Sequence, residues 1–207
     1  MLRLHYHPLS PYSRKASTAI ALRGDAVELC EIALGSGALQ RPEFLALSPF
    51  GKMPVLETPD EGPIIESTSI IEYLEAKGPP VLLPPGAARA ARHFDRLGDL
   101  YLVEPVAAWF WERTSPAGQA APERARRAWA LFEARLSGRA FVCGDAFGLG
   151  DLAGAIATDY FEREGVEPPA AIRAWKDRCF AIPAMRASLE AAVPWVESTR
   201  PMRQRGA

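Results

Sequence analysis

A proline-rich segment divides the chain into two parts. It covers residues 79–86 and contains Pro79, Pro80, Pro84 and Pro85. Proline donates no backbone N–H, so this segment is predicted to be a linker rather than a helix or a strand. A chain of 207 residues is long enough for two modest domains. We therefore expect domains over residues 1–78 and 87–199, with a mobile tail over residues 200–207.

The first part combines strand and helix patterns. Residues 2–7 alternate apolar and polar side chains, as a strand does, and Ser10 and Pro11 are typical of the first positions of a helix. The whole pattern predicts strands over residues 2–7, 26–32, 53–57 and 63–66, and helices over residues 11–23, 41–47 and 67–77. This order is typical of a thioredoxin-like domain with a mixed four-stranded sheet whose first two strands are parallel.

The second part is helical in character. It is rich in alanine and carries apolar residues at helical spacing, which predicts helices over residues 87–113, 122–136, 149–164 and 169–180. Pro105 should kink the first of these helices. The predicted fold class is therefore α/β plus all-α, with a thioredoxin-like N-terminal domain followed by an all-helical C-terminal domain.

Composition narrows the class of partner and the location. The formal net charge of −1 gives no reason to expect nucleic acid or an anionic membrane surface as a partner. We find neither a secretory leader nor an apolar run long enough to span a bilayer, which predicts a cytoplasmic protein. The three cysteines, Cys30, Cys143 and Cys179, lack metal-ligand or C-x-x-C spacing. We expect them to be buried and reduced, and we expect no metal.

The segment Ser10-Pro11-Tyr12-Ser13 has the spelling of a glutaredoxin Cys-Pro-Tyr-Cys site with both sulfurs replaced by oxygen. Serines carry no redox chemistry, but a hydroxyl at a helix N-terminus can donate a hydrogen bond to the thiolate of a bound cofactor. Together, the hydroxyl and the helix N-terminus can lower a thiol pKa by about one to two units. Glutathione is the obvious candidate thiol.

Ser10 has alternatives as the donor, and it also has a simpler role. A serine at a helix start is most often only an N-cap, which stabilises a helix by about 1 kcal/mol. Tyr6, Tyr12 and Ser13 each carry a hydroxyl close to the same junction. Tyr6 is expected in the core by strand alternation, Tyr12 at the mouth of the cleft, and Ser13 bonded within its own helix.

Two further segments are expected to bind a peptide that carries both a carboxylate and an ammonium group. Met53 precedes Pro54 at the start of a strand, and a cis bond there would leave the backbone of Met53 free to pair with an extended peptide. Glu66 and Ser67 begin the last helix of the first part, where free N–H groups hold an anion and Glu66 can hold an ammonium group. Capping alone also explains that second pair.

The chain resembles the cytosolic glutathione transferases, in particular bacterial members of the serine-type classes (theta-, phi- or zeta-like). The resemblance rests on Ser10 with its helix, on Phe50-Gly51-Lys52-Met53-Pro54 and on Glu66-Ser67-Thr68-Ser69-Ile70-Ile71-Glu72-Tyr73-Leu74. The segment over residues 141–151 resembles the capping segment of the family's helical domain, so the match covers essentially the whole chain.

This resemblance implies roles for individual residues. Ser10 would activate the thiol, Met53 and Pro54 would clamp the cysteinyl backbone of glutathione, and Glu66 with Ser67 would hold its γ-glutamyl end. Lys52 lies where it can reach the glycyl carboxylate. The family also implies a homodimer, in which Phe50 matches an aromatic residue that locks into the partner subunit.

The chain departs from the family's pattern at two places. The cap in the helical domain is commonly serine or threonine, whereas here Gly148 stands there and only Asp151 and a Phe147–Leu152 staple remain. Zeta-like isomerases carry Ser-Ser-Cys at the first junction, whereas no cysteine lies between Ser10 and Ser13. The first departure bears on local stability, and the second makes an isomerase less favoured.

A second, hydrophobic substrate requires an apolar wall. The helical part offers the aromatic residues Tyr101, Trp109, Phe110 and Trp111, although such a cluster is more often core than pocket. We expect the pocket to involve Tyr12, Tyr101, Trp109 and Phe110.

The predicted function is a glutathione transferase that ionises bound glutathione and adds its sulfur to an apolar electrophile, without a metal. Two alternatives stay open. One is a glutathione-dependent disulfide reductase or isomerase, and the other is a non-catalytic protein of the same fold that binds ligands or proteins.

Overall fold

The computed structural model describes residues 1–205 and contains one sheet of four strands. The strands are β1 (Leu2–Tyr6), β2 (Val27–Glu31), β3 (Val55–Thr58) and β4 (Gly62–Ile65). Their order in the sheet is β2-β1-β3-β4. β1 pairs in parallel with β2, whereas β3 runs antiparallel to both β1 and β4. The predicted mixed four-stranded sheet is confirmed.

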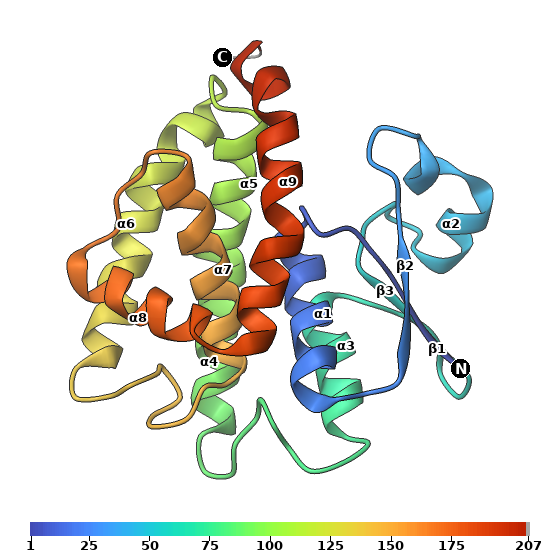
Figure 1. Ribbon diagram of the computed structural model, residues 1–207, viewed down its shortest axis with the longest axis horizontal. Coiled ribbons are helices and arrows are strands. Elements are labelled where there is room, and N and C mark those ends of the chain that lie inside the picture. Colours follow the sequence, from blue (N-terminus) through green and yellow to red (C-terminus); the bar gives the residue numbers. More distant parts are fainter. Residues whose placement is uncertain (206–207) are drawn as a thin grey trace.

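Helices cover both faces of this sheet. α1 (Pro11–Arg23) and α3 (Ser67–Glu75) lie between the sheet and the helical part of the chain, whereas α2 (Pro42–Leu47) lies on the other side (Figure 1). A short 3₁₀ helix, η1 (Ala38–Gln40), precedes α2. Apolar residues of β1, β3, α1 and α3 form one core cluster: Leu4, Ala16, Ile20, Leu56, Ile70 and Leu74. The sheet therefore presents α1, with its N-terminus, to the helical domain.

The remaining helices form the second domain. They are α4 (Ala88–Gly98), α5 (Glu104–Trp111), α6 (Pro116–Leu136), α7 (Leu149–Arg163), α8 (Ala170–Phe180) and α9 (Pro183–Arg205). α7 is the central helix, because every residue from Leu149 to Phe161 is buried. α9 runs along the domain and packs on α1 (Figure 1). The predicted thioredoxin-like domain followed by an all-helical domain is thus confirmed.

Prolines caused the main errors in predicting these helices. A π-helical segment, η2 (Asp99–Val103), joins α4 to α5 just before Pro105, so the first predicted helix is divided into three elements. The kink at Pro105 stays a prediction. α6 starts at Pro116 rather than at Pro122, because Ser115 caps it by accepting a hydrogen bond from the N–H of Gly118 at 3.0 Å. α9 was not predicted at all, although it tolerates two internal prolines through its packing on the rest of the domain.

Two predictions about exposed or buried segments are also corrected. α9 continues through Arg205, so residues 200–205 are helical where a mobile tail was expected, and residues 206–207 lie outside the described residues. Cys143 and Cys179 are buried, but Cys30 is only half-buried on β2. All three cysteines are free. No helix of the described chain is long and apolar enough to cross a membrane.

The start of α7 explains why a glycine stands at the cap position. A Cβ atom on Gly148 would lie 2.7 Å from Sγ of Cys143 and 3.0 Å from the carbonyl oxygen of Leu82, so no side chain fits there. Asp151 stabilises this helix start instead. Its carboxylate accepts hydrogen bonds from the backbone N–H of Gly148 at 3.0 Å and of Val142 at 2.9 Å, and from the indole N–H of Trp175 at 2.8 Å.

We expect Asp151→Ala to destabilise the protein by about 3 kcal/mol or more, because three buried donors would lose their acceptor. The free energy of unfolding in urea measures this change. Asp177→Ala is the control, since that carboxylate is exposed on α8 and surface substitutions alter stability by only about 0.5 kcal/mol. Equal stability of the two variants would contradict this role of Asp151.

Candidate active site

The junction between β1 and α1 positions Ser10. Its backbone N–H donates to the carbonyl of His7 at 3.0 Å, which forms a tight turn after the strand. The Oγ atom of Ser10 accepts a hydrogen bond from the N–H of Ser13 at 3.3 Å, so Ser10 is the N-cap of α1. Because this bond uses the hydroxyl oxygen only as an acceptor, the hydroxyl hydrogen remains available to donate to a ligand.

The three competing hydroxyls differ in their environments. Ser13 is fully buried, and its Oγ accepts from the N–H of His7 at 3.3 Å. Burial raises the pKa of Tyr6, which lies half-buried on β1. Burial also raises the pKa of Tyr12, and the carboxylates of Asp99, Glu104 and Glu66 act in the same direction. Both phenols therefore keep their protons near neutral pH.

The loop before β3 carries the next predicted residues. The bond between Met53 and Pro54 is cis, and β3 begins only at Val55, so Met53 precedes the strand ladder. The Oγ atom of the buried Ser48 accepts from the N–H of Lys52 at 3.2 Å, which fixes the turn that precedes Met53. Lys52 itself is exposed.

The start of α3 is the one place where a residue other than glycine has positive φ among the described residues. Glu66 has φ 71° and ψ 121°, and it stands at the N-cap position, immediately before Ser67, the first residue of α3. Such a conformation costs of order 1–3 kcal/mol and is found mainly where function requires it. The first N–H groups of α3 have no partner within the helix, so they can bind an anion.

A cavity of about 380 Å³ brings most of the predicted residues together. Its lining includes Lys52, Met53, Pro54, Glu66 and Ser67 from the sheet domain, together with Tyr12. The helical domain closes the opposite side with Arg96, Asp99, Leu100, Glu104 and Ala107. This volume lies within the range of small-molecule sites.

A second cavity, of about 280 Å³, contains Ser10. It shares Tyr12, Lys52, Met53 and Ala107 with the first cavity, so the two adjoin. Its other walls are largely apolar: Leu9, Pro11, Leu34, Leu39, Gly51 and Trp111. We call the cavity of about 380 Å³ the polar cavity and the cavity of about 280 Å³ the apolar cavity. Ser10 therefore lines the apolar cavity and lies next to the polar cavity.

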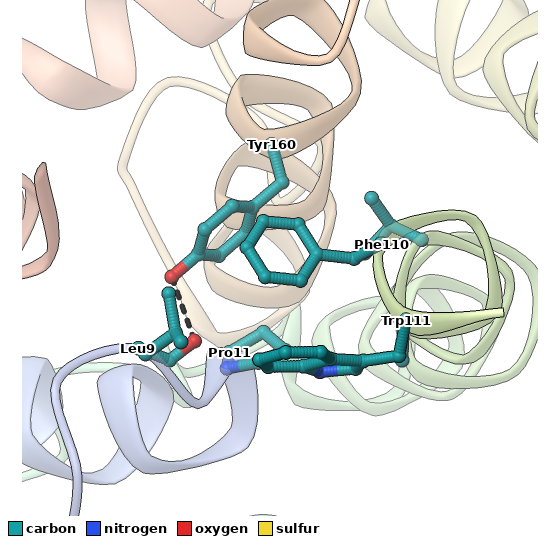
Figure 2. A pocket seen from close by; sticks show the side chains of 7 residues that line it. Leu9, Pro11, Phe110, Trp111 and Tyr160 are labelled. Carbon is teal, nitrogen blue, oxygen red and sulfur yellow. Dashed lines mark hydrogen bonds between the residues drawn. The ribbon is translucent and has the colours of Figure 1, made fainter. Parts of the chain in front are cut away.

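The predicted aromatic residues are distributed unevenly. Phe110 lines a hollow of about 30 Å³, which has room for a water molecule, together with Trp111 and Tyr160 (Figure 2). In that hollow the hydroxyl of Tyr160 donates to the carbonyl of Leu9 at 2.8 Å, and this bond ties α7 to the junction before α1. Trp111 lines both this hollow and the cavity of Ser10.

Tyr101 and Trp109 are not among the residues that line these three cavities. The indole of Trp109 stacks on the guanidinium of Arg113 at 4.2 Å and donates to the carbonyl of Glu164 at 3.4 Å. The residues that our prediction did not include come mainly from the helical domain: Arg96, Asp99, Leu100, Glu104 and Ala107. Their only sequence signal is a spacing of three or four residues along one helix face.

The described residues contain no group of three or more His, Cys, Asp or Glu side chains arranged to hold a metal ion. The chemistry of the two cavities is that of hydroxyls, backbone N–H groups and charged side chains. Groups of these kinds can hold a peptide-like zwitterion beside an apolar partner.

Two family models match this chain. "Glutathione S-transferase, N-terminal domain" matches residues 4–82, and "Glutathione S-transferase, C-terminal domain" matches residues 92–183. Because these matches cover more than half of the sequence, the chain belongs to the glutathione S-transferase family.

Individual relatives agree with this result. The chain is 30% identical to glutathione S-transferase 2 of Saccharomyces cerevisiae over 203 residues, covering 88% of this chain and 87% of the relative. The crystal structure of Gtt2 from Saccharomyces cerevisiae has a TM-score of 0.80 at 26% identity and covers 90% of this chain and 99% of that one. A probable elongation factor 1-gamma 2 of Arabidopsis thaliana is 33% identical over 120 residues, covering 54% of this chain and 29% of that protein.

We expect Glu66→Gly to stabilise the protein by about 1 kcal/mol, because glycine adopts positive φ without a steric penalty but loses more entropy on folding. Urea unfolding measures the change. Glu66→Gln is the matched control, since it keeps the side chain and the backbone conformation and should alter stability by less than about 0.5 kcal/mol. A Glu66→Gly variant that is no more stable than the control would show that Glu66 is unstrained.

Proposed function

We propose that this protein is a glutathione transferase that binds glutathione across the polar cavity and transfers its thiolate to an apolar electrophile. The observation that carries this proposal is the position of Ser10. Its hydroxyl lies at the N-terminus of α1 and Ser10 lines the apolar cavity, which adjoins the polar cavity with its peptide-binding features.

The polar cavity suits the charges of glutathione. The N-terminus of α3 at Ser67 suits the γ-glutamyl carboxylate, and the exposed ammonium group of Lys52 suits the glycyl carboxylate. The backbone of Met53, ahead of β3, suits the cysteinyl residue as an added strand would. A tripeptide held at these three points extends its sulfur toward the junction of β1 and α1.

Ser10 then acts as the catalytic donor. Its hydroxyl hydrogen bonds to the sulfur and favours the thiolate, and the N-terminus of α1 adds a favourable electrostatic interaction. The thiolate attacks the electrophile and a carbon–sulfur bond forms. In a substitution the leaving group departs with its electron pair, and in a conjugate addition the electron pair of the broken π bond moves onto the acceptor and takes a proton from water. The proton of the thiol is released to solvent in the ionisation step.

The apolar cavity is proposed to bind the electrophile. Trp111 is half-exposed, with 52% of its surface accessible, and Leu34 and Leu39 line the same cavity from the segment before α2, Leu39 within η1. An aromatic or alkyl electrophile stacked there lies beside Ser10. In this arrangement Trp111 takes the place that we had expected for Tyr101 and Trp109.

Ser10→Ala should raise the pKa of the bound glutathione thiol by about one unit or more and lower kcat/KM near pH 6.5 by about tenfold. Ultraviolet titration of the thiolate and steady-state kinetics measure these two effects. Glutathione affinity should change little, because Ser10 interacts with the sulfur and not with the charged ends of the ligand.

Three variants separate this role from helix capping. Ser10→Thr restores a hydroxyl and should restore the thiol pKa, whereas Ser13→Ala removes a buried hydroxyl and should leave it as in the wild type. If Tyr12→Phe raises the thiol pKa and Ser10→Ala does not, Tyr12 is the donor. A wild-type protein that binds glutathione without lowering its thiol pKa would contradict the transferase function.

Trp111→Ala should raise the KM for an aromatic electrophile by about three- to tenfold, because it removes a large apolar wall, while the KM for glutathione stays unchanged. Initial rates with 1-chloro-2,4-dinitrobenzene as the electrophile measure both constants. Leu131→Ala on α6 is the control, since Leu131 is similarly exposed at 55% but does not line either cavity. Equal KM values in the two variants would place the electrophile elsewhere.

The match to elongation factor 1-gamma supports one alternative, a non-catalytic protein of the same fold. Turnover of a mixed disulfide in place of an aryl halide would instead identify a glutathione-dependent disulfide reductase, and turnover of a double-bond isomer would identify an isomerase.

The serine-type class, the homodimer with Phe50 at its interface, and the cytoplasmic location stay predictions. Phe50 is 71% exposed in the single chain, which is compatible with that interface.

A further inference from the structure

The residue before Ser10 is held by two buried side chains, and the proposed function makes no use of either. The backbone N–H of Leu9 donates to Nδ1 of His7 at 3.0 Å. Its carbonyl oxygen accepts from the hydroxyl of Tyr160 on α7 at 2.8 Å (Figure 2). His7 is completely buried and Tyr160 is 3% exposed. The peptide groups on both sides of Leu9 are therefore fixed by side chains, one from each domain.

The bond from Leu9 determines the protonation of the His7 ring. A backbone N–H only donates, so Nδ1 must be the unprotonated nitrogen of a neutral imidazole whose hydrogen is on Nε2. Burial lowers the pKa of His7, although the carboxylate of Glu31 on β2 opposes this effect. Nε2 has no hydrogen-bond partner among the described residues, because Oε1 of Glu31 is 3.8 Å away. The hydrogen bond that the ring makes is thus the one to the turn before Ser10.

Packing fixes the orientation of this ring. The indole of Trp195 on α9 meets the imidazole edge to face, with 4.5 Å between the ring centres and 68° between the ring planes. An acceptor on the side chain two residues before a backbone N–H is the geometry of an Asx turn, which aspartate and asparagine commonly form. Histidine makes the same bond here and also reaches α9, so the turn is tied to a helix far away in the sequence.

The helix that follows the turn is anchored independently. Lys15 on α1 is completely buried and forms an ion cluster with Asp95 on α4 at 2.7 Å and with Asp99 on η2 at 2.8 Å. Its ammonium group also donates to the hydroxyl of Thr68 on α3 at 3.2 Å. A buried ion pair is costly to break. Loss of a hydrogen bond at Leu9 is therefore expected to move the turn and not the helix.

The position of Ser10 depends directly on this turn. The peptide group between Leu9 and Ser10 carries the carbonyl that Tyr160 holds, and the N–H of Ser10 donates to the carbonyl of His7 at 3.0 Å. A hydroxyl that donates to a reacting atom must lie within hydrogen-bond distance of it, and a displacement of about 1 Å can cost a large part of its effect. His7 itself lines neither the polar nor the apolar cavity.

We propose that His7 is a positioning residue for Ser10. Its neutral imidazole fixes the N–H of Leu9 while Tyr160 fixes the carbonyl, and together they place the hydroxyl of Ser10 beside the sulfur of the bound thiol. This inference rests on the proposed role of Ser10 as the hydrogen-bond donor to glutathione. His7 acts only through Ser10 and does not contact the ligand.

Two substitutions of His7 test this inference. In His7→Gln the side-chain amide lies near the place of Nε2, so the acceptor for Leu9 is lost. The thiol pKa of bound glutathione should rise by about half a unit to one unit, and kcat/KM with 1-chloro-2,4-dinitrobenzene near pH 6.5 should fall by about three- to tenfold. In His7→Asn the amide oxygen can replace Nδ1, as in an Asx turn, and should restore kcat/KM to within about twofold of the wild type.

The comparison of these two variants separates positioning from packing. Both lose the ring contact with Trp195, so urea unfolding should show that both are destabilised. If His7→Asn restores neither the thiol pKa nor kcat/KM relative to His7→Gln, the inference is wrong. A His7→Gln variant with the thiol pKa of the wild type also overturns it, and Ser10→Ala then shows whether the proposed function still holds. A wild-type protein that does not lower the thiol pKa overturns both.

A double variant shows whether His7 acts through Ser10. In a protein that already carries Ser10→Ala, adding His7→Gln should leave the thiol pKa within about 0.3 units of the single Ser10→Ala variant, because no hydroxyl is left to position. Additive effects of the two substitutions would contradict the inference.

His5→Gln is the matched control on the same strand. The Nε2 atom of His5 lies 2.6 Å from the carboxylate of Glu57 on β3, and its ring is not bonded to the turn. This variant should keep the thiol pKa of the wild type. If it raises the thiol pKa as much as His7→Gln does, general loosening of β1 explains the effect and the inference fails.

Nitrogen-15 NMR of the imidazole rings tests the same inference in the wild-type protein at pH 7.5. The chain has three histidines, and single substitutions of His5 and His93 identify the signals of His7. His7 should have its hydrogen on Nε2 and an unprotonated Nδ1. A hydrogen on Nδ1, in either a neutral or a charged ring, would overturn the inference, because Nδ1 could not then accept from Leu9.

Discussion

The ion cluster around Lys15 is the interaction on which the arrangement of the two domains depends. A buried ammonium group must be paired, and breaking such a pair by removing one partner costs about 3–5 kcal/mol. Here the partners come from both domains, so α1 cannot shift against α4 without leaving a buried charge alone. Arg14, the preceding residue, is also buried, with its guanidinium 5.1 Å from the ring centre of Tyr160.

This anchoring of α1 also positions the chemistry. Ser10 caps the same helix whose next turn carries Arg14 and Lys15, so the hydroxyl is fixed relative to the helical domain as well as to the sheet. Tyr160 adds a direct link by donating to the carbonyl of Leu9, one residue before Ser10. The two cavities therefore keep their shape because the residues between them belong to a helix that is clamped on both sides.

The sequence was sufficient to predict the strands and helices of the sheet domain, because the sequence signals for these elements are local. Alternation in residues 2–7, Pro11 at the start of a helix and Pro54 before a strand each act within a few residues, and the predicted order of elements is confirmed. It was insufficient for α9 and for the start of α6, because internal prolines weaken a helix that tertiary packing then restores. Local propensity contains no information about that packing.

The same distinction applies to the candidate site. Ser10, Met53 and Glu66 lie at backbone junctions, where a motif determines the geometry, and the structure places all three at the two cavities. The aromatic residues and Asp99 lie on helix faces, and their directions depend on how α4, η2 and α5 are rotated.

That rotation has a physical cause in the chain. Pro105 donates no hydrogen bond, and just before it the N–H of Glu104 bonds to the carbonyl of Asp99 five residues back, which widens the helix into the π segment η2. Leu102 and Val103 then point into the core while Asp99, Leu100 and Glu104 line the polar cavity. Pro105 thus gives different environments to residues that a regular helical pattern would place on the same face. Asp99, which the sequence alone would place on a solvated helix face, lies at the wall of the polar cavity.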